Sequence, residues 1–264
     1  MDRITLTITS LSIFSGILNI EITLLFLNAE MQTKAIVSAS LFVALFSSVQ
    51  AQGVLRITEF MSEGQGLIGP GTGANRQREF FELTNVGSAA LDISSYSYND
   101  NNVNDPHNFG ASFGVVASGE SIILTQMTAD NFRSYWGLSS SVRIFSYGQA
   151  SNLGNNDTIN IYNSATQSPA TLVDSLLFTE TARGSGISRN RPVNIGTGQA
   201  INDLWVDSVV GDSYGSILAP NPIFPVGAAY VDLANPGTYP VPEPATLFVL
   251  SLGIAKLVRA RKSA

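Results

Sequence analysis

The sequence contains no cysteine, and among its 264 residues it has a single histidine, His107. The lack of cysteine excludes disulfides, thiolate nucleophiles, zinc–thiolate sites and iron–sulfur clusters. A single histidine excludes a cluster of imidazoles around a transition metal. Carboxylates, hydroxyls and arginines remain, so the composition excludes several common kinds of catalytic centre.

Charge is also scarce, since 13% of the residues are charged, about half of the roughly 25% found in an average globular protein. The apolar residues are concentrated at the two ends. Residues 52–241, called the body below, hold sixteen acidic residues, eight arginines and no lysine, for a net charge of −8. The body therefore has no lysine for a Schiff base or a Ser–Lys dyad. Its negative charge repels phosphate backbones, so nucleic acid is not an expected partner.

Residues 31–51 have the three parts of a secretory signal peptide. Lys34 precedes an apolar core over residues 35–46, and Val49 and Ala51 stand at positions −3 and −1 of a small-residue cleavage site. This order predicts export, with signal peptidase cutting before Gln52.

A second apolar stretch over residues 4–27 precedes that signal and is interrupted by Glu21. Because a signal peptide begins at its own methionine, we interpret residues 1–30 as an over-called start or a leader, with Met31 as the true start. The alternative is a membrane anchor of about 20 residues, a length that can span a bilayer. Glu21 counts against this alternative because a carboxylate inside a bilayer is costly.

The C-terminal residues have an equally ordered pattern. Pro242, Glu243 and Pro244 precede an apolar run over residues 245–255, and a basic cluster closes the chain. Basic residues after an apolar run are typical of a stop-transfer helix held by positive charges on the inside. The run is shorter than the roughly 20 residues of a stable span, which favours a temporary anchor.

This tail, residues 242–264, closely resembles the PEP-CTERM sorting signal of exported bacterial proteins. The resemblance implies recognition and cleavage near Pro242-Glu243-Pro244 by an exosortase, a transpeptidase-like membrane enzyme. It also implies a Gram-negative host that makes exopolysaccharide.

The body itself is a series of short runs separated by Gly, Asn, Asp, Ser and Pro, the residues that make turns. Their spacing indicates a β-sandwich or a Greek-key barrel. One helix is predicted over residues 128–136, with Phe132, Tyr135 and Trp136 on one apolar face, which we interpret as core packing rather than a ligand platform. The predicted strands are residues 54–60, 80–84, 93–98, 121–125, 142–147, 158–162, 172–178, 186–189 and 204–210.

The order of several motifs in the body resembles the lamin-tail domain family. Residues 55–60 fit that family's first "I-x-E" strand, residues 79–85 fit "E-F-[IV]-E-L-x-N", and residues 92–96 fit "D-[IL]-S-x-[WY]". Later segments up to about Arg189 continue the resemblance, although Asn156 stands where the family has glycine. The resemblance implies an immunoglobulin-like sandwich, which we place at residues 52–219, and it implies no activity. We interpret residues 220–241 as a Pro-rich linker.

Oxygen-bearing side chains gather in one loop of the body. Asp100, Asn102, Asn104 and Asp105 are hard ligands of the kind that Ca²⁺ prefers. The loop is no EF-hand, because the twelfth position is Ala111 and the sixth is not glycine. We predict a polar loop between strands, with a loose calcium site as the alternative; no other cofactor is expected.

The remaining candidates for chemistry are three glutamates and the histidine. Glu79 and Glu82 are three residues apart and should face opposite sides of a strand, whereas Glu59 and Glu82 could meet across adjacent strands. Such a pair does acid–base work on glycosides only at roughly 5–9 Å inside a cleft, so we predict a structural role. His107 has no Gly-x-Ser-x-Gly elbow to serve, and we expect it in a solvent-exposed loop.

These features predict an exported surface or extracellular-matrix protein with a binding or structural role and no catalytic activity. Its expected partners are signal peptidase, an exosortase, the inner membrane during transit, and exopolysaccharide or other matrix components of a biofilm. The alternative is a secreted hydrolase or a calcium-dependent carbohydrate-binding module.

Overall fold

A computed structural model describes residues 11–14, 17–20, 51–62, 64, 78–100, 106–147, 153, 156–179, 186–193, 204–221 and 231–241. The chain divides into two compact units, residues 1–50 and residues 51–264. In the first unit, β1 (Leu11–Phe14) and β2 (Ile17–Ile20) pair as an antiparallel hairpin. Both strands lie within the apolar stretch over residues 4–27.

The predicted signal helix and the predicted C-terminal anchor helix lie outside the described residues. Within the described ranges, no helix is both long and apolar enough to span a bilayer.

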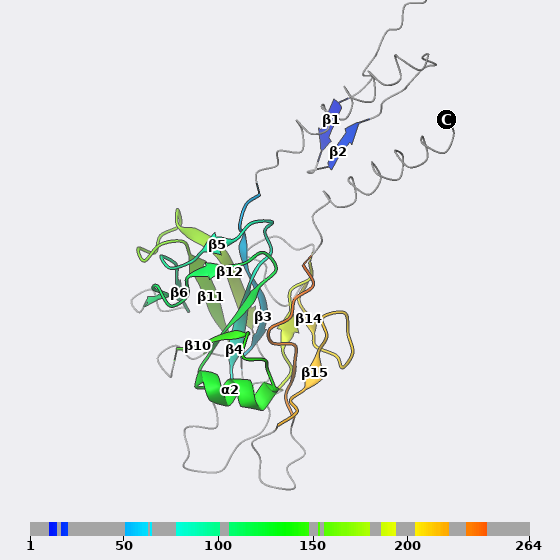
Figure 1. Ribbon diagram of the computed structural model, residues 1–264. Helices are drawn as coiled ribbons and strands as arrows, with labels where there is room; N and C mark the ends of the chain where they lie inside the picture. Colours follow the sequence, from blue (N-terminus) through cyan, green and yellow to red (C-terminus); the bar gives the residue numbers. More distant parts are fainter. Residues whose placement is uncertain are drawn as a thin grey trace, which may run out of the picture. The chain divides into compact units, whose positions relative to one another are not determined.

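The second unit is built on two packed sheets (Figure 1). The neighbouring strands of both sheets pair antiparallel, except for the parallel pair β9–β10. The larger sheet has the order β10 (Arg143–Ser146), β9 (Ser121–Thr125), β4 (Phe80–Asn85), β3 (Leu55–Met61), β13 (Arg189–Asn190) and β14 (Val206–Asp207). The smaller sheet has the order β12 (Leu172–Thr179), β11 (Asn156–Tyr162), β6 (Ser97–Asn99) and β7 (His107–Asn108). Two short pairs join β5 (Leu91–Asp92) to β8 (Val115–Val116) and β15 (Ile217–Leu218) to β16 (Leu233–Ala234).

The main core lies between the two sheets. Side chains alternate along a strand, so Phe81 and Leu83 of β4 enter this core, while Phe80 of the same strand packs on the opposite face. Burying one such side chain is worth roughly 1.5–3 kcal/mol. The core members from the smaller sheet include Tyr98, Ile159, Ile161, Leu176 and Phe178.

The single helix among the described residues, α2 (Ala129–Trp136), covers the outer face of the larger sheet at one end. Phe132, Tyr135 and Trp136 are buried there against Phe80. The predicted helix and the predicted core role of its aromatic face are therefore confirmed.

The ends of α2 follow from the sequence. Thr128 precedes the helix with extended backbone angles, and its hydroxyl accepts the backbone N–H of Asn131 at 3.3 Å. Gly137 ends the helix at a φ of 62°, and its N–H donates to the carbonyl oxygens of Arg133 and Ser134. A side chain with a Cβ is strained at such an angle.

Replacing Thr128 with alanine removes the hydroxyl that accepts the Asn131 N–H. We expect the free energy of unfolding to fall by about 1 kcal/mol, measured by urea denaturation. Thr166→Ala is the matched control, because Thr166 is exposed and lies outside the helix. Equal effects from the two variants would contradict the capping role.

Several predicted boundaries are wrong. The strand predicted over residues 204–210 is limited to Val206–Asp207, and the one predicted over residues 186–189 lies at Arg189–Asn190. Residues 93–98 were expected to form one strand, but a turn occupies their first part, because Asp92 accepts the N–H and hydroxyl of Ser94. The prediction of a linker over residues 220–241 is wrong for residues 231–241. We call residues 231–241 the closing segment. β16 of this segment pairs with β15, and Asp232 and Asn235 are buried.

Candidate functional site

Two glutamates meet on the outer face of the larger sheet. Glu59 of β3 is the register partner of Glu82 on β4, and both side chains are fully buried. The predicted meeting of these residues across adjacent strands is therefore confirmed. We call Glu59 and Glu82 the carboxylate pair.

A β-bulge in β3 places Glu59 on this outer face. The register shifts between Ile57 and Glu59, so that Ile57 pairs with Leu83 while Glu59 pairs with Glu82. Ile57 and Phe60 both enter the core between the sheets although they are three residues apart. A regular strand would send them to opposite faces, and the extra residue, Thr58, resolves the conflict.

Each member of the pair accepts hydrogen bonds from neutral donors. Glu82 Oε1 accepts the hydroxyls of Thr58 at 2.7 Å and Thr84 at 3.1 Å. Glu59 Oε1 accepts the hydroxyl of Ser188. No cation is among these donors, so the negative charge of the pair is not neutralised by them.

The closing segment supplies one backbone donor to each carboxylate. The N–H of Asn235 lies 2.8 Å from Glu59 Oε1, and the N–H of Gly237 lies 2.7 Å from Glu82 Oε2. These two residues flank Pro236 in a single turn, whose last N–H, that of Thr238, donates to the Asn235 carbonyl. The carboxylate pair therefore holds this turn against the sheet.

Burial strongly changes the acidity of the pair. Loss of water raises the pKa of Glu59 well above its ordinary value, and the nearby charge of Glu82 raises it further. Burial also raises the pKa of Glu82 to about 7, although its hydrogen bonds oppose that rise. Glu59 Oε2 accepts no hydrogen bond within the described part of the chain. Burial and the neighbouring carboxylate therefore both favour the protonated form of Glu59.

This arrangement suits structural work better than acid–base catalysis. A catalytic carboxylate pair must reach its substrate in a cleft, whereas both glutamates are sealed from solvent. The predicted structural role agrees with the hydrogen bonds that the pair accepts.

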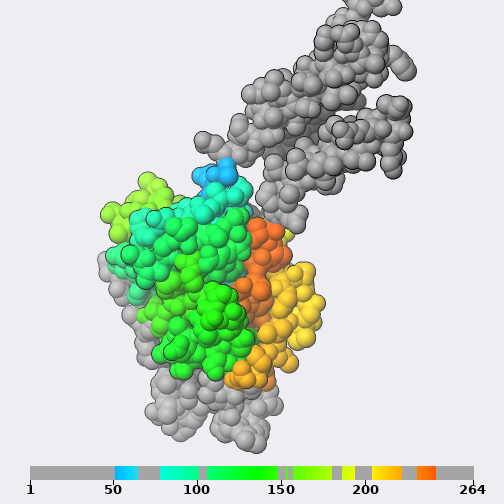
Figure 2. Space-filling view, viewed as in Figure 1, coloured from blue at the N-terminus to red at the C-terminus, as the bar shows by residue number. Residues whose placement is uncertain are grey.

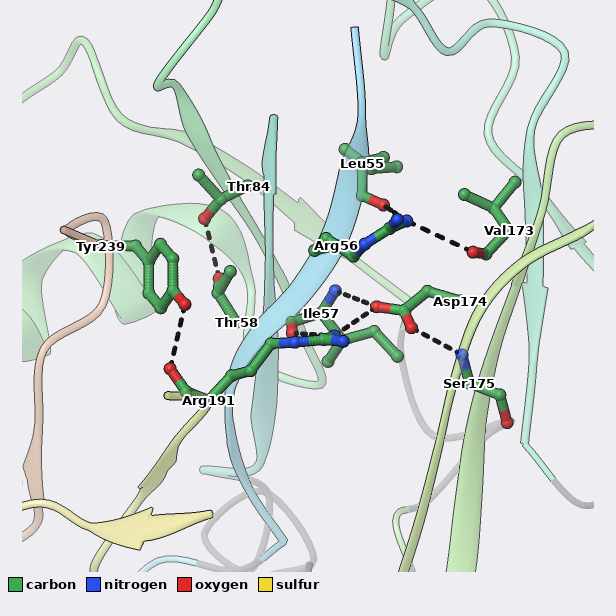
Figure 3. Close-up of polar contacts among 10 residues, drawn as sticks. All are labelled: Leu55, Arg56, Ile57, Thr58, Thr84, Val173, Asp174, Ser175, Arg191 and Tyr239. Carbon is green, nitrogen blue, oxygen red and sulfur yellow. Dashed lines mark hydrogen bonds and ion pairs between the residues drawn. The ribbon is translucent and has the colours of Figure 1, made fainter. Parts of the chain in front are cut away.

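A buried ion pair lies on the opposite side of the same bulge (Figure 3). Arg191, which follows β13, approaches Asp174 of β12 with an Nη1–Oδ2 distance of 2.6 Å. The same Arg191 nitrogen donates to the carbonyl of Ile57, whose own N–H donates to Asp174 Oδ2 at 2.9 Å. Because Asp174 belongs to the smaller sheet and Arg191 follows a strand of the larger one, the pair fastens the two sheets together at the bulge.

A second buried ion pair connects the closing segment to the start of β4. Arg78 Nε lies 2.7 Å from Asp232 Oδ2, and the hydroxyl of Tyr135 donates to the same oxygen at 2.8 Å. The Arg78 guanidinium also lies over the Tyr135 ring, 5.7 Å from its centroid. Burial and Asp232 raise the pKa of Tyr135, so its hydroxyl remains a donor.

The structure corrects the prediction for His107. This residue lies on β7 as the register partner of Tyr98, and its ring stacks on the Tyr98 ring with centroids 4.8 Å apart. His107 is half-buried rather than exposed in a loop, because pairing with β6 gives the segment a sheet edge to lie on. Glu79 and Glu82 do face different sides, since Glu79 Oε1 accepts the Tyr147 hydroxyl and the Leu153 N–H.

The other predicted sites fall largely outside the described residues. Of the calcium candidates, Asp100 is described and half-buried, whereas Asn102, Asn104 and Asp105 lie outside. The signal-peptidase residues Ala51 and Gln52 are described and exposed, and Val49 lies outside. The sorting residues Pro242, Glu243 and Pro244 also lie outside. Among the described residues, no group of three or more histidine, aspartate or glutamate side chains is arranged to hold a metal ion.

Sequence reasoning missed the roles of Arg78, Arg191, Asp232 and the donors of the closing segment. One signal for the two ion pairs was available in the sequence. Arginine is almost never fully buried without a partner, and it is the only basic residue type besides histidine in the body, so any buried carboxylate that has a cationic partner there would be expected to pair with an arginine. No comparable signal marks Asn235 or Gly237, whose contacts are made by backbone N–H groups.

The family model of the Lamin Tail Domain matches residues 48–178. This part of the chain is thus similar to that family, and the predicted immunoglobulin-like β-sandwich is confirmed. Such a domain suggests a structural or binding role rather than a catalytic one. No curated protein matches the chain. The match ends within β12. Several partners of residues in the matched region therefore come from later in the chain, namely Ser188, Arg191 and the closing segment.

Proposed function

We propose that this protein is an exported, non-catalytic β-sandwich of a bacterial surface or extracellular matrix, freed at both ends by proteolysis. Signal peptidase cuts between Ala51 and Gln52, and an exosortase cuts near Pro242 after the tail has held the protein at the inner membrane. The sandwich then binds or builds matrix material, with exopolysaccharide as the expected component.

The observation that carries the proposal is the position of the two cuts relative to the folded contacts. Ala51 and Gln52 are exposed, and Val54, two residues further on, already donates to Asn85 at 2.9 Å. At the other end, the Tyr239 hydroxyl donates to the Arg191 carbonyl at 3.0 Å, three residues before Pro242. Both cuts therefore leave the sandwich and its closing segment intact.

The test is to express the full reading frame in an exosortase-bearing host and to measure the mass and terminal peptides of the exported protein. We expect an N-terminus at Gln52 and a C-terminus near Pro242. Mass above that of the peptide would report attached glycans.

Two variants separate the sorting motif from its surroundings. Replacing Glu243 with alanine should leave the tail attached and the protein in the membrane fraction. Pro240→Ala is the matched control, since Pro240 is exposed and outside the motif, and its product should be processed normally. A wild-type protein that keeps its tail in this host would identify the tail as a permanent anchor and overturn the exosortase step.

A further inference from the structure

Exposed aliphatic side chains are concentrated in one part of the fold. Of eleven exposed large hydrophobic residues among the described ranges, eight lie between residues 187 and 218. Single exposed apolar residues are ordinary on a protein surface, but a contiguous group marks an interaction site. The eight are Ile187, Val193, Leu204, Val206, Val209, Val210, Ile217 and Leu218.

Four of these residues share one turn. Val209 and Val210 are each 61% exposed, and the N–H of the next residue, Gly211, donates to the carbonyl of Ser216 at 3.1 Å. Ile217 and Leu218 follow Ser216 directly and are also exposed. The hydrogen bond brings the two valines beside this pair, and we call Val209, Val210, Ile217 and Leu218 the apolar turn.

The chain leaves the fold next to the apolar turn. Tyr239 packs on Tyr214, which lies inside the turn, with ring centroids 6.2 Å apart. Thr238 also donates its hydroxyl to the carbonyl of Tyr214 at 3.3 Å. Figure 2 shows the segment 204–221, in yellow and gold, on the molecular surface beside the orange closing segment. Val241 is thus two residues from a direct contact with the turn.

The sequence after Val241 limits how far the turn can lie from the apolar tail. The apolar run begins at Ala245, so the connection includes only Pro242, Glu243 and Pro244. Four residues of fully extended chain span at most about 14 Å. Any surface that takes up the apolar run therefore lies close to the apolar turn.

Two carboxylates close to the apolar turn in the sequence, Asp212 and Asp207, already have partners within the protein. Asp212 accepts the N–H groups of Val209, Tyr214 and Ser216, which keeps its carboxylate directed at the turn's own backbone. Asp207 pairs with Arg189 at 2.7 Å. The exposed side chains that the turn presents to a partner are mainly aliphatic.

We propose that the apolar turn rests on the lipid surface and holds the body against the membrane while the tail is attached. This inference rests on the proposed function, because it needs the tail to be in a membrane. Aliphatic side chains enter the interfacial region of a bilayer in proportion to the apolar area they bury. The body has no lysine and a charge of −8, so the surface that it fits is a zwitterionic one rather than a strongly anionic one.

The absence of cysteine from the sequence permits a direct test. Val210→Cys is introduced into the tail-bearing protein, labelled with an environment-sensitive fluorophore, and reconstituted into phosphatidylcholine vesicles. We expect a blue shift of the emission and quenching by a lipid-attached quencher. Val115→Cys is the matched control, because Val115 is 58% exposed and lies on β8. Its probe should show neither effect.

The outcomes separate this inference from the proposed function. Flotation of the protein with the vesicles and no quenching at position 210 would overturn the docking while leaving the anchor in place. Failure of the protein to float would overturn both. A blue shift at position 210 that appears without lipid and grows with protein concentration would identify a second copy as the occupant and overturn the lipid surface. Adding Val209→Asp to the labelled Val210→Cys protein should abolish the quenching, whereas adding Val115→Asp should not.

Discussion

Replacing Asp174 with alanine is expected to lower the free energy of unfolding by about 3 to 5 kcal/mol, the usual cost of removing one partner from a buried ion pair. The guanidinium of Arg191 would remain buried without its carboxylate, since its side chain is 5% exposed and that of Asp174 is fully buried. The N–H of Ile57 would lose its acceptor as well. Urea denaturation at neutral pH measures the loss.

Asp207→Ala is the matched control for Asp174→Ala. Asp207 pairs with Arg189 at a similar distance, 2.7 Å, but its side chain is 62% exposed. An exposed pair of this kind contributes about 0–1 kcal/mol, so this variant should unfold almost as the wild type does. If both variants lost the same free energy, the inter-sheet role of Asp174 would be contradicted.

A double variant keeps the test informative if Asp174→Ala does not fold. Replacing Asp174 with leucine and Arg191 with methionine removes both charges and fills the site with apolar side chains. Such replacements of a buried ion pair are often neutral or stabilising. We expect the double variant to be more stable than Asp174→Ala; if it is less stable, the ion pair is needed for more than charge compensation.

The stability of the wild-type protein should fall as the pH rises from 5 to 8. The pKa of Glu82 is about 7 in the folded protein against an ordinary value of 4.5, and that of Glu59 is raised in the same direction. The folded state therefore binds more protons than the unfolded state over this range, so the stabilisation present below pH 4.5 is lost as the pH passes 7. At about 1.4 kcal/mol per pKa unit, Glu82 alone accounts for roughly 3 kcal/mol. Urea midpoints at pH 5, 6, 7 and 8 give the curve.

Isosteric amides distinguish the two members of the pair. Glu59→Gln keeps the oxygen that accepts from Ser188 and Asn235, and places an NH₂ group where Oε2 has no donor. We expect this variant to be at least as stable as wild type at pH 8 and to have a flatter pH curve. Glu82→Gln should instead be about 1 to 3 kcal/mol less stable than Glu59→Gln at pH 8, because an acceptor of Thr58 or Gly237 becomes a donor. Equal stabilities of the two variants, or a wild-type stability that rises towards pH 8, would contradict the raised pKa of Glu59.

Local sequence signals predicted much of the sandwich. Residues 121–125 form a short apolar run that follows a turn at residues 117–120, and the predicted strand and β9 coincide. Thr128 and Gly137 bracket α2 because capping and left-handed termination depend on neighbouring residues only. The register of Glu59 with Glu82 was also within reach, since adjacent antiparallel strands bring such residues face to face.

The failed predictions depend on contacts between distant parts of the chain. His107 looked like a loop residue because its neighbours are turn formers, and only pairing with β6 gives it a strand. Residues 231–241 looked like a linker because of their prolines, yet their backbone N–H groups bind carboxylates more than 150 positions earlier in the chain. A pattern of side chains does not reveal which buried acceptor a backbone donor will meet.

The sequence by itself determined the all-β character, the core-facing helix and the ordered signals at both ends, because each follows from local periodicity, turn chemistry or composition. The tertiary structure alone decided where the charges of the body lie. The bulge at Thr58 moved Glu59 to the outer face of the larger sheet, and the closing segment then sealed it from water. The physical reason is that burial and hydrogen bonding, which set the pKa and the role of a carboxylate, arise only when distant strands are packed together.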